Sequence, residues 1–376
     1  MKLKNFSGIK EDFDIPNAVY LDSASKTYCP KPVITTLSQI SNQYDFLDDY
    51  EQVRHKIKSL INSKKESEIV FTYSNTHSLN ILAQGICHTW KPKDCIIVPE
   101  SEHYANLNIW KILSEHYGFR FETVNVIKDG SLDLGHLEDI LEACDGKILF
   151  SISHISNTIG YRQPIKELFS KVKEYDGITM LDASLSISRE KIDVQDMQID
   201  LLTFGANTFF GPTGTGVLYG KHKILEKLSS LIWDNNSNQI PWKLESTTPN
   251  ISNVIAMGSA IDWFNQYDLE SFQSYDRLLN ATIQSELSDL EFIEIFHPGY
   301  YKSGLISFNV KGKYPKDVET FLRKDNIIVN SGYLDAQAIV EEKFVNGVVR
   351  ASWHCYTTKE DIVQLKDSLI RCFESK

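Results

Sequence analysis

The stretch from Asp200 to Gly220 reads DLLTFGANTFFGPTGTGVLYG, in which two short apolar runs flank a segment rich in glycine. Apolar runs of this length, bounded by glycine and proline, are typical of strands joined by a tight turn. The turn GPTGTG matches neither a Walker A loop nor a GxGxxG fingerprint, so its residues alone indicate no nucleotide. The stretch therefore predicts two apolar strands connected by a turn.

Upstream of this stretch, further β-rich runs alternate with segments of helical spacing at about His77 to Ile86, Asn106 to Tyr117 and Leu137 to Ala143. This alternation predicts an open, mostly parallel α/β sheet, whose ligands collect at the carboxyl ends of the strands. The expected strands are IVFT at Ile69 to Thr72, CIIVP from Cys95, KILFSIS from Lys147, ITMLDA from Ile178, LLTFG from Leu201 and GVLYG from Gly216.

The pattern changes after a polar, proline-containing segment from Ser229 to Asn250. We therefore expect a large α/β domain over residues 18–250, and a smaller α+β domain formed by residues 1–17 and 251–376. The elements expected in the second part are two amphipathic helices, Val254 to Tyr267 and Leu269 to Leu287, the strand-like runs LISFNV, NIIVNS and VVRASW, and a closing helix from Lys359.

The composition excludes several classes of function. Of the 376 residues, 42% are apolar and 24% are charged, which is typical of a globular protein with a full core. The net charge of −11 argues against nucleic acid as a partner. No apolar run is long enough for a signal peptide or a membrane span, so a cytoplasmic location is expected. The six cysteines show neither a CxxC nor a Cys/His spacing, so no metal site is expected.

The motifs of the chain, taken in order, resemble those of class V aminotransferases and cysteine desulfurases. These proteins belong to the fold-type I superfamily of pyridoxal-phosphate (PLP) enzymes, so the resemblance implies that architecture. The matching segments run from Val19 to Phe373 and include YLDSAS at Tyr20, EIVFTYSNTHSLN at Glu68, SEHYANLNIW at Ser101, SISHISNTIG at Ser151, ITMLDAS at Ile178, GPTGTGVLY at Gly211, ESTTPN at Glu245 and VVRASWHCYTTKEDI at Val348.

The resemblance assigns roles to several residues that the chain keeps. His103 matches the histidine that stacks on the pyridine ring, and Asp182 matches the carboxylate that keeps the ring nitrogen protonated. Thr76 matches a phosphate contact at a helix start, and Thr248 matches a phosphate contact that the second subunit supplies. The positions that orient a substrate are Asn157 and Arg350, the latter by a bidentate grip on an α-carboxylate. On the residues alone, each of these side chains has an ordinary structural explanation.

Other positions depart from the family pattern. The His-Lys pair, whose lysine forms the imine with PLP, is replaced by Asn207 and Thr208, and a hydroxyl cannot form an imine. Asp335 falls on the persulfide cysteine, and a carboxylate cannot carry sulfur in that way. The remaining replacements are Asn75 in the TTE triplet, Leu185 for a glutamine, Arg189 for a histidine, Gly205 for a serine and Asn330 for an arginine.

Fold analogy alone would assign an ordinary cysteine desulfurase or aminotransferase that uses an unrecognised lysine, but Lys26, Lys221 and Lys223 have no motif that delivers them to the ring. Two further functions are consistent with these departures. One is a catalytically silent homologue, either a binding protein or the inactive half of a heterodimer with a lysine-containing paralogue. The other is an enzyme that holds PLP, its amine form (PMP) or another phosphorylated ligand noncovalently and acts on an amino-acid-like substrate. Such an enzyme would need another group in place of the lysine to move the proton, and the candidates are His77, Asn207, Arg189 and Asp335. A homodimer and the absence of any cofactor both remain open, and Cys355 is expected to pack as a small apolar residue.

Overall fold

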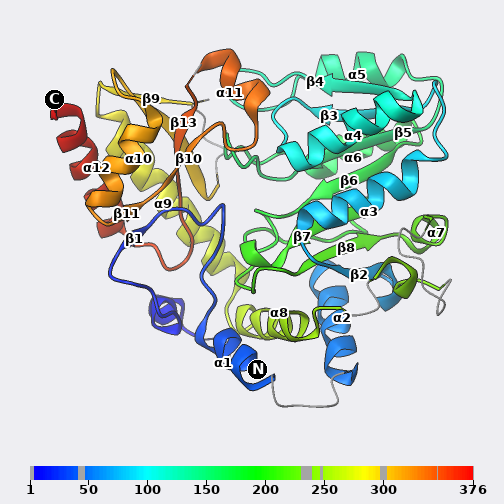
Figure 1. Cartoon of the computed structure of the whole chain (residues 1–376), viewed down its shortest axis with the longest axis horizontal. Helices are drawn as coiled ribbons and strands as arrows, with labels where there is room; N and C mark the ends of the chain where they lie inside the picture. The colour runs from blue at the N-terminus through cyan, green and yellow to red at the C-terminus, as the bar shows by residue number, and fades with distance from the viewer. Residues whose placement is uncertain are drawn as a thin grey trace.

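The fold was described from a computed structural model of the chain, and the structure describes residues 4–40, 47–229, 239–245, 249–296, 303–344 and 346–375. A large sheet with its helices fills one side of the molecule, and a smaller sheet with its own helices fills the other (Figure 1). The first elements along the chain are η1 (Phe6–Asp12), β1 (Val19–Tyr20), α1 (Lys31–Ile40), α2 (Leu47–Ile61) and η2 (Glu66–Glu68).

The large sheet has seven strands in the order β2-β8-β7-β6-β5-β3-β4. All of its strand pairs are parallel except those of β8, which runs antiparallel to both of its neighbours. This arrangement confirms the predicted open, mostly parallel sheet and the predicted turn between β7 and β8. The strands are β2 (Ile69–Thr72), β3 (Cys95–Pro99), β4 (Arg120–Val124), β5 (Ile148–Ser153), β6 (Ile178–Asp182), β7 (Leu201–Gly205) and β8 (Gly216–Gly220).

Strand β4 was not among the expected strands. Its sequence, RFETV, contains two charged residues, and most of its side chains are only partly buried because it forms an edge of the sheet. An edge strand does not need the continuous apolar run that marks a central parallel strand. Strand β4 is therefore recognisable by its pairing with β3 rather than by its hydrophobicity.

Both faces of the large sheet are buried. Alternate residues of a strand enter different cores: Ile96 and Val98 of β3 pack with α3 and α4, whereas Cys95 and Ile97 pack with α2, α5, α6 and α8. The helices of this part are α3 (Asn75–Cys87), α4 (Tyr104–Tyr117), α5 (Leu134–Glu142), α6 (Ile165–Glu174) and α7 (His222–Leu225), with the short turns η3 (Ala206–Thr208) and η4 (Trp242–Leu244).

The second sheet is antiparallel, in the order β12-β13-β10-β9, and packs with α9, α10 and α12. The run NIIVNS divides between two sheets, because Ile327 and Ile328 pair with β1 whereas Asn330 begins β12. The elements are α8 (Ile251–Phe264), α9 (Leu269–Ser288), β9 (Ile293–Ile295), β10 (Leu305–Val310), α10 (Pro315–Lys324), β11 (Ile327–Ile328), β12 (Asn330–Gly332), α11 (Gln337–Lys343), β13 (Val348–Ser352) and α12 (Lys359–Glu374).

Helix α8 packs against α1 and α2 and contributes Val254, Met257 and Trp263 to the core of the large sheet. Helix α9 instead contributes Leu279, Ile283 and Leu287 to the core of the small sheet. The residues at which the two domains divide stay a prediction.

A buried ion pair fixes α2 to the edge of the large sheet. The side chain of Arg54 is 1% exposed and that of Glu245 is 4% exposed, with Nη1 donating to Oε1 over 2.7 Å. Arg54 also donates to the carbonyl of Ile69 (2.6 Å), and Glu245 accepts from the backbone N–H of Phe71 (2.8 Å) and the hydroxyl of Tyr50 (3.0 Å). The pair therefore joins helix α2, strand β2 and the segment after η4.

We predict that Glu245→Gln lowers the free energy of unfolding by about 3 kcal/mol, because it removes the buried one of the two carboxylates that pair with the Arg54 guanidinium. The double variant Arg54→Met with Glu245→Gln should recover much of this loss, since no buried charge remains. Glu51→Gln is the control, because Glu51 contacts Arg54 from a more exposed position and should cost less than about 1 kcal/mol. Urea unfolding measures all three, and a similar cost for Glu51→Gln and Glu245→Gln would contradict the prediction.

Candidate functional site

The carboxyl ends of β2, β3, β5, β6 and β7 converge on one pocket of about 360 Å³. A pocket of this size lies within the usual range for small-ligand sites. Of the predicted site residues that the structure describes, only Gly205 does not line it. The predicted residues in the lining are Asn75, Thr76, His103, Asn157, Asp182, Leu185, Asn207, Thr208, Asp335 and Arg350.

The start of helix α3 forms one wall of the pocket. Ser74 is the N-cap residue, and its hydroxyl accepts from the backbone N–H of His77, while Asn75 and Thr76 form the first turn. The first N–H groups of a helix have no partner within the helix, and the helix dipole favours an anion there. Strand β8 passes close behind, because a side chain on Gly216 would collide with the backbone of Ser74.

Asp182 ends strand β6 and is almost fully buried. The side chain of Asn75 donates to Oδ2 over 2.6 Å, and the backbone N–H of Ser184 donates to Oδ1 over 2.9 Å. Two buried polar atoms beside the carboxylate, Oδ1 of Asn75 and Oγ of Ser184, make no hydrogen bond within the described part of the chain. Buried polar groups are normally paired, so these atoms indicate room for a polar ligand.

His103 is the N-cap residue of α4, and its ring is fixed from both sides. Nδ1 accepts from the backbone N–H of Ala105 over 3.0 Å. Nε2 lies 3.3 Å from Oδ2 of Asp335. The loop that carries Asp335 also contacts the pocket through its backbone, since the carbonyl of Asp335 accepts from the N–H of Tyr104 over 2.6 Å.

Asn207 and Thr208 lie in the turn η3, directly after β7. The Thr208 hydroxyl donates to the carbonyl of Gly205 (3.1 Å), and the Asn207 side chain donates to the carbonyl of Ser25 (3.1 Å). Gly205 itself lies just outside the lining, and a side chain there would collide with Oδ1 of Asn207. A side chain at 205 would therefore require the Asn207 side chain to move.

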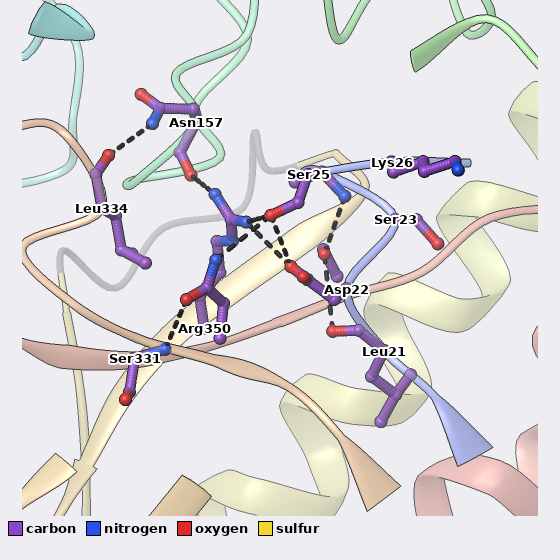
Figure 2. A network of polar contacts seen from close by, with 12 residues as sticks. Leu21, Asp22, Ser23, Ser25, Lys26, Asn157, Ser331, Leu334 and Arg350 are labelled. Atoms are coloured by element: carbon purple, nitrogen blue, oxygen red, sulfur yellow. Dashed lines mark hydrogen bonds and ion pairs between the residues drawn. The ribbon is translucent and has the colours of Figure 1, made fainter. Parts of the chain in front are cut away.

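Arg350 lies opposite, on strand β13, and its guanidinium is engaged by the protein itself (Figure 2). Nη2 donates to Oδ1 of Asp22 (2.9 Å) and to Oγ of Ser25 (2.7 Å), while Nη1 donates to the carbonyl of Asn157 (3.0 Å). The Asn157 side chain donates in turn to the carbonyl of Leu334 over 2.8 Å. Asp22 and Ser25 come from the YLDSAS motif, which sequence reasoning quoted without assigning them a role.

Several suspected replacements lie outside the pocket. Arg189 donates to Asp276 of α9 (2.7 Å) and to the carbonyl of Trp353, which directly follows β13 (2.5 Å). His77 does not line the pocket either, because its Nδ1 accepts from the backbone N–H of Tyr73. Cys355 is buried in the core of the large sheet. The residues that line the pocket in the described structure include neither a lysine nor a cysteine, and Thr248 lies outside the described residues.

Sequence reasoning also missed a buried carboxyl group behind the pocket. Glu102 precedes His103 and accepts from the backbone N–H and hydroxyl of Ser153 and from the side chain of Asn106. Burial, reinforced by the nearby Asp182 carboxylate, raises the pKa of Glu102 to about 7. Ser153 lines the pocket, so Glu102 supports the pocket floor without reaching it. The sequence carried no clear signal for it, because the junction from Pro99 to Tyr104 reads PESEHY and is polar throughout.

The comparisons with known proteins agree with this geometry. The sequence profile of class V aminotransferases matches residues 19–365, which is most of the chain. The chain belongs to the class V aminotransferase family. A probable cysteine desulfurase of Halalkalibacterium halodurans is 30% identical to it, over 97% of this chain and 96% of that protein. A cysteine desulfurase of Haloferax volcanii is 27% identical, over 96% of this chain and 90% of that protein.

Solved structures of cysteine desulfurases have the same fold as this class V aminotransferase family member. The cysteine desulfurase CsdA of Escherichia coli superposes with a TM-score of 0.92 at 27% identity and covers 99% of both chains. The apo cysteine desulfurase of Thermococcus onnurineus NA1 gives a TM-score of 0.93 at 26% identity, covering 100% of this chain and 99% of that one. The expected fold-type I architecture is therefore confirmed, and PLP is the cofactor of the family.

The described residues contain no cluster of three or more histidine, cysteine, aspartate or glutamate side chains that could hold a metal ion. Within the same residues, no helix is long and apolar enough to cross a membrane.

We predict that the Glu102 carboxyl makes the protein less stable as the pH rises. Between the ordinary pKa of glutamate, 4.5, and about 7, the folded protein retains a proton that the unfolded chain has lost. The stabilisation that protonated Glu102 provides is complete below pH 4.5 and is lost as the pH rises through about 7. Glu102→Gln mimics the protonated group, so its unfolding free energy relative to wild type should rise by about 3 kcal/mol between pH 5 and pH 8.

Chemical denaturation at both pH values measures this difference. Glu115→Gln, on the exposed face of the same helix α4, is the control and should show no such pH dependence. A difference between Glu102→Gln and wild type that stays constant from pH 5 to pH 8 would contradict the prediction.

Proposed function

We propose that this class V family member binds PLP or PMP noncovalently and does not carry out the standard desulfurase or aminotransferase reaction. The observation that carries the proposal is the pocket lining, which presents Thr208 and Asn207 from the turn after β7 and contains no lysine or cysteine among the described residues. The resemblance to the family puts its lysine at Thr208 and its persulfide cysteine at Asp335. A hydroxyl and a carboxylate cannot do the covalent chemistry of these two groups.

The residues that remain fit a phosphorylated pyridine. Asp182 is a buried carboxylate that suits a protonated ring nitrogen, and each of its oxygens has capacity for a further hydrogen bond. The N-terminus of α3 suits a phosphate group, and the His103 ring suits one face of the pyridine. The unpaired Asn75 Oδ1 and Ser184 Oγ supply further polar partners. Bound PLP supplies an electron sink for a carbanion, and the protein supplies its position and electrostatic setting.

A second role, as the silent subunit of a heterodimer with a lysine-containing paralogue, is favoured by the state of Arg350. Its guanidinium is already paired with the Asp22 carboxylate of the same chain. Asp22 therefore occupies the position in which, by resemblance to the family, a substrate carboxylate would bind. A protein that only binds a ligand or completes a partner's site would not need that grip. A homodimer remains compatible with the binding proposal.

The binding proposal predicts that PMP raises the melting temperature in a concentration-dependent way. PMP is the better probe because it cannot condense with surface lysines as PLP does. Asp182→Asn should weaken PMP at least about tenfold, since it removes a charge-assisted hydrogen bond. Asp196→Asn, at an exposed surface ion pair, is the control and should bind like wild type. An unchanged melting temperature with PMP, or equal affinity in Asp182→Asn, would sink the proposal.

Restoring the family pair provides a gain-of-function test. The variant Asn207→His with Thr208→Lys should become covalently attached to PLP after borohydride reduction, with the adduct mapped to position 208 by peptide mass spectrometry. Position 208 is buried and lines the pocket, so the new amine would face the ligand. Thr208→Met, of comparable length but without an amine, is the control and should carry no adduct there. Equal labelling of the two variants would contradict the assignment of Thr208 to the lysine position.

A further inference from the structure

The charges that line the pocket are unevenly matched. Arg350 is paired with Asp22, whereas Asp182 lies at the floor of the pocket and Asp335 at its rim. In the described structure, the ion-pair contact of Asp335 is with the His103 ring, whose Nε2 lies 3.3 Å from Oδ2. Among the described residues, no lysine or arginine forms an ion pair with Asp335, and its side chain is 69% exposed, so its carboxylate is available to a cationic ligand.

Because the Arg350 guanidinium already donates to Asp22, Ser25 and Asn157, few of its N–H groups are free to bind an incoming carboxylate. Asp22 occupies Nη2 together with Ser25, and the Ser25 hydroxyl donates to the same Asp22 oxygen over 2.8 Å. Asn330 reinforces this arrangement by donating to Ser25 over 3.1 Å. The remaining nitrogen, Nε of Arg350, is buried away from solvent. A ligand carboxylate would have to displace Asp22 to make a bidentate contact with the guanidinium (Figure 2).

The backbone holds Asp335 in place at a conformational cost. Leu334 and Asp335 both have left-handed backbone angles, with φ of 54° and 55°, and leucine rarely adopts this conformation. Two hydrogen bonds to the pocket wall support the loop, from Asn157 to the carbonyl of Leu334 and from Tyr104 to the carbonyl of Asp335. Strained residues that the surroundings fix in this way cluster at ligand sites. The strained loop therefore supports a role for the Asp335 carboxylate in ligand binding.

We propose that Asp335 determines ligand specificity, and that the pocket accepts an amine with a second cationic group and no carboxylate beside the amine, such as a simple diamine. This inference rests on the proposed binding of PLP or PMP. Asp182 and the start of α3 are then used by the ring nitrogen and the phosphate, which leaves Asp335 to face the rest of the ligand. An ammonium group is attracted to it, whereas an α-carboxylate is repelled and finds Arg350 occupied. The ligand therefore differs from the amino acid that the family resemblance implies.

The test uses the full-length protein saturated with pyridoxine 5′-phosphate, which cannot condense with amines and so separates binding from reaction. Calorimetry with 1,4-diaminobutane and with L-alanine compares the two ligand classes. The diamine should bind more tightly than L-alanine, and Asp335→Asn should weaken the diamine about three- to fivefold, as expected for a partly exposed charge pair. Asp367→Asn, on the exposed face of α12, is the charge-matched control and should bind the diamine like wild type.

A second variant tests the role of Asp22. Asp22→Asn releases the Arg350 guanidinium, so L-alanine should gain affinity while the diamine is little affected. Tighter binding of L-alanine than of the diamine to the wild-type protein, or an unchanged diamine affinity in Asp335→Asn, overturns this inference and leaves the cofactor proposal standing. Failure of pyridoxine 5′-phosphate and PMP to bind at all overturns the proposed function, and this inference with it.

Discussion

Burial of both faces of the seven-stranded sheet is the constraint on which the rest of the structure depends. Helices α3 and α4 cover one face and α2, α5, α6 and α8 cover the other, so most side chains within the central strands are apolar. Polar groups can therefore gather only where strands end. Because five strands end at the same edge, Asp182, His103, Asn157, Thr208 and the start of α3 are brought together although they lie far apart in the sequence. The pocket is thus a consequence of the sheet.

The sequence predicted this edge well because it depends on local patterns. Continuous apolar runs marked the buried strands, and many of the residues that follow these strands line the pocket. Strand β4 was missed because an edge strand lacks that pattern, and the division of NIIVNS between two sheets depends on long-range pairing with β1 and β13. The roles assigned to individual residues came from the family resemblance, since a lone histidine or aspartate carries no such information.

The sequence could not predict which side chains form hydrogen bonds and ion pairs with one another. Arg350 was read as a substrate contact, but the partner that occupies it, Asp22, lies more than three hundred residues away along the chain. Arg189 was suspected as a pocket residue, yet it donates to Asp276 of α9 and to the carbonyl of Trp353. The proximity of Asp335 to His103 likewise depends on two left-handed residues in a loop. Each of these contacts alters the charge that a ligand would meet.

These contacts support the proposal that the pocket keeps the fold and the cofactor-facing residues of the family but accepts a ligand of different chemistry. The most direct test is a crystal structure of the wild-type protein grown with PLP. The account predicts electron density for the ring beside Asp182 and His103, with the phosphate at the start of α3 and no density joining the ligand to any side chain. Continuous density from the ligand to a lysine side chain, or a pocket that stays empty at saturating PLP, would contradict it.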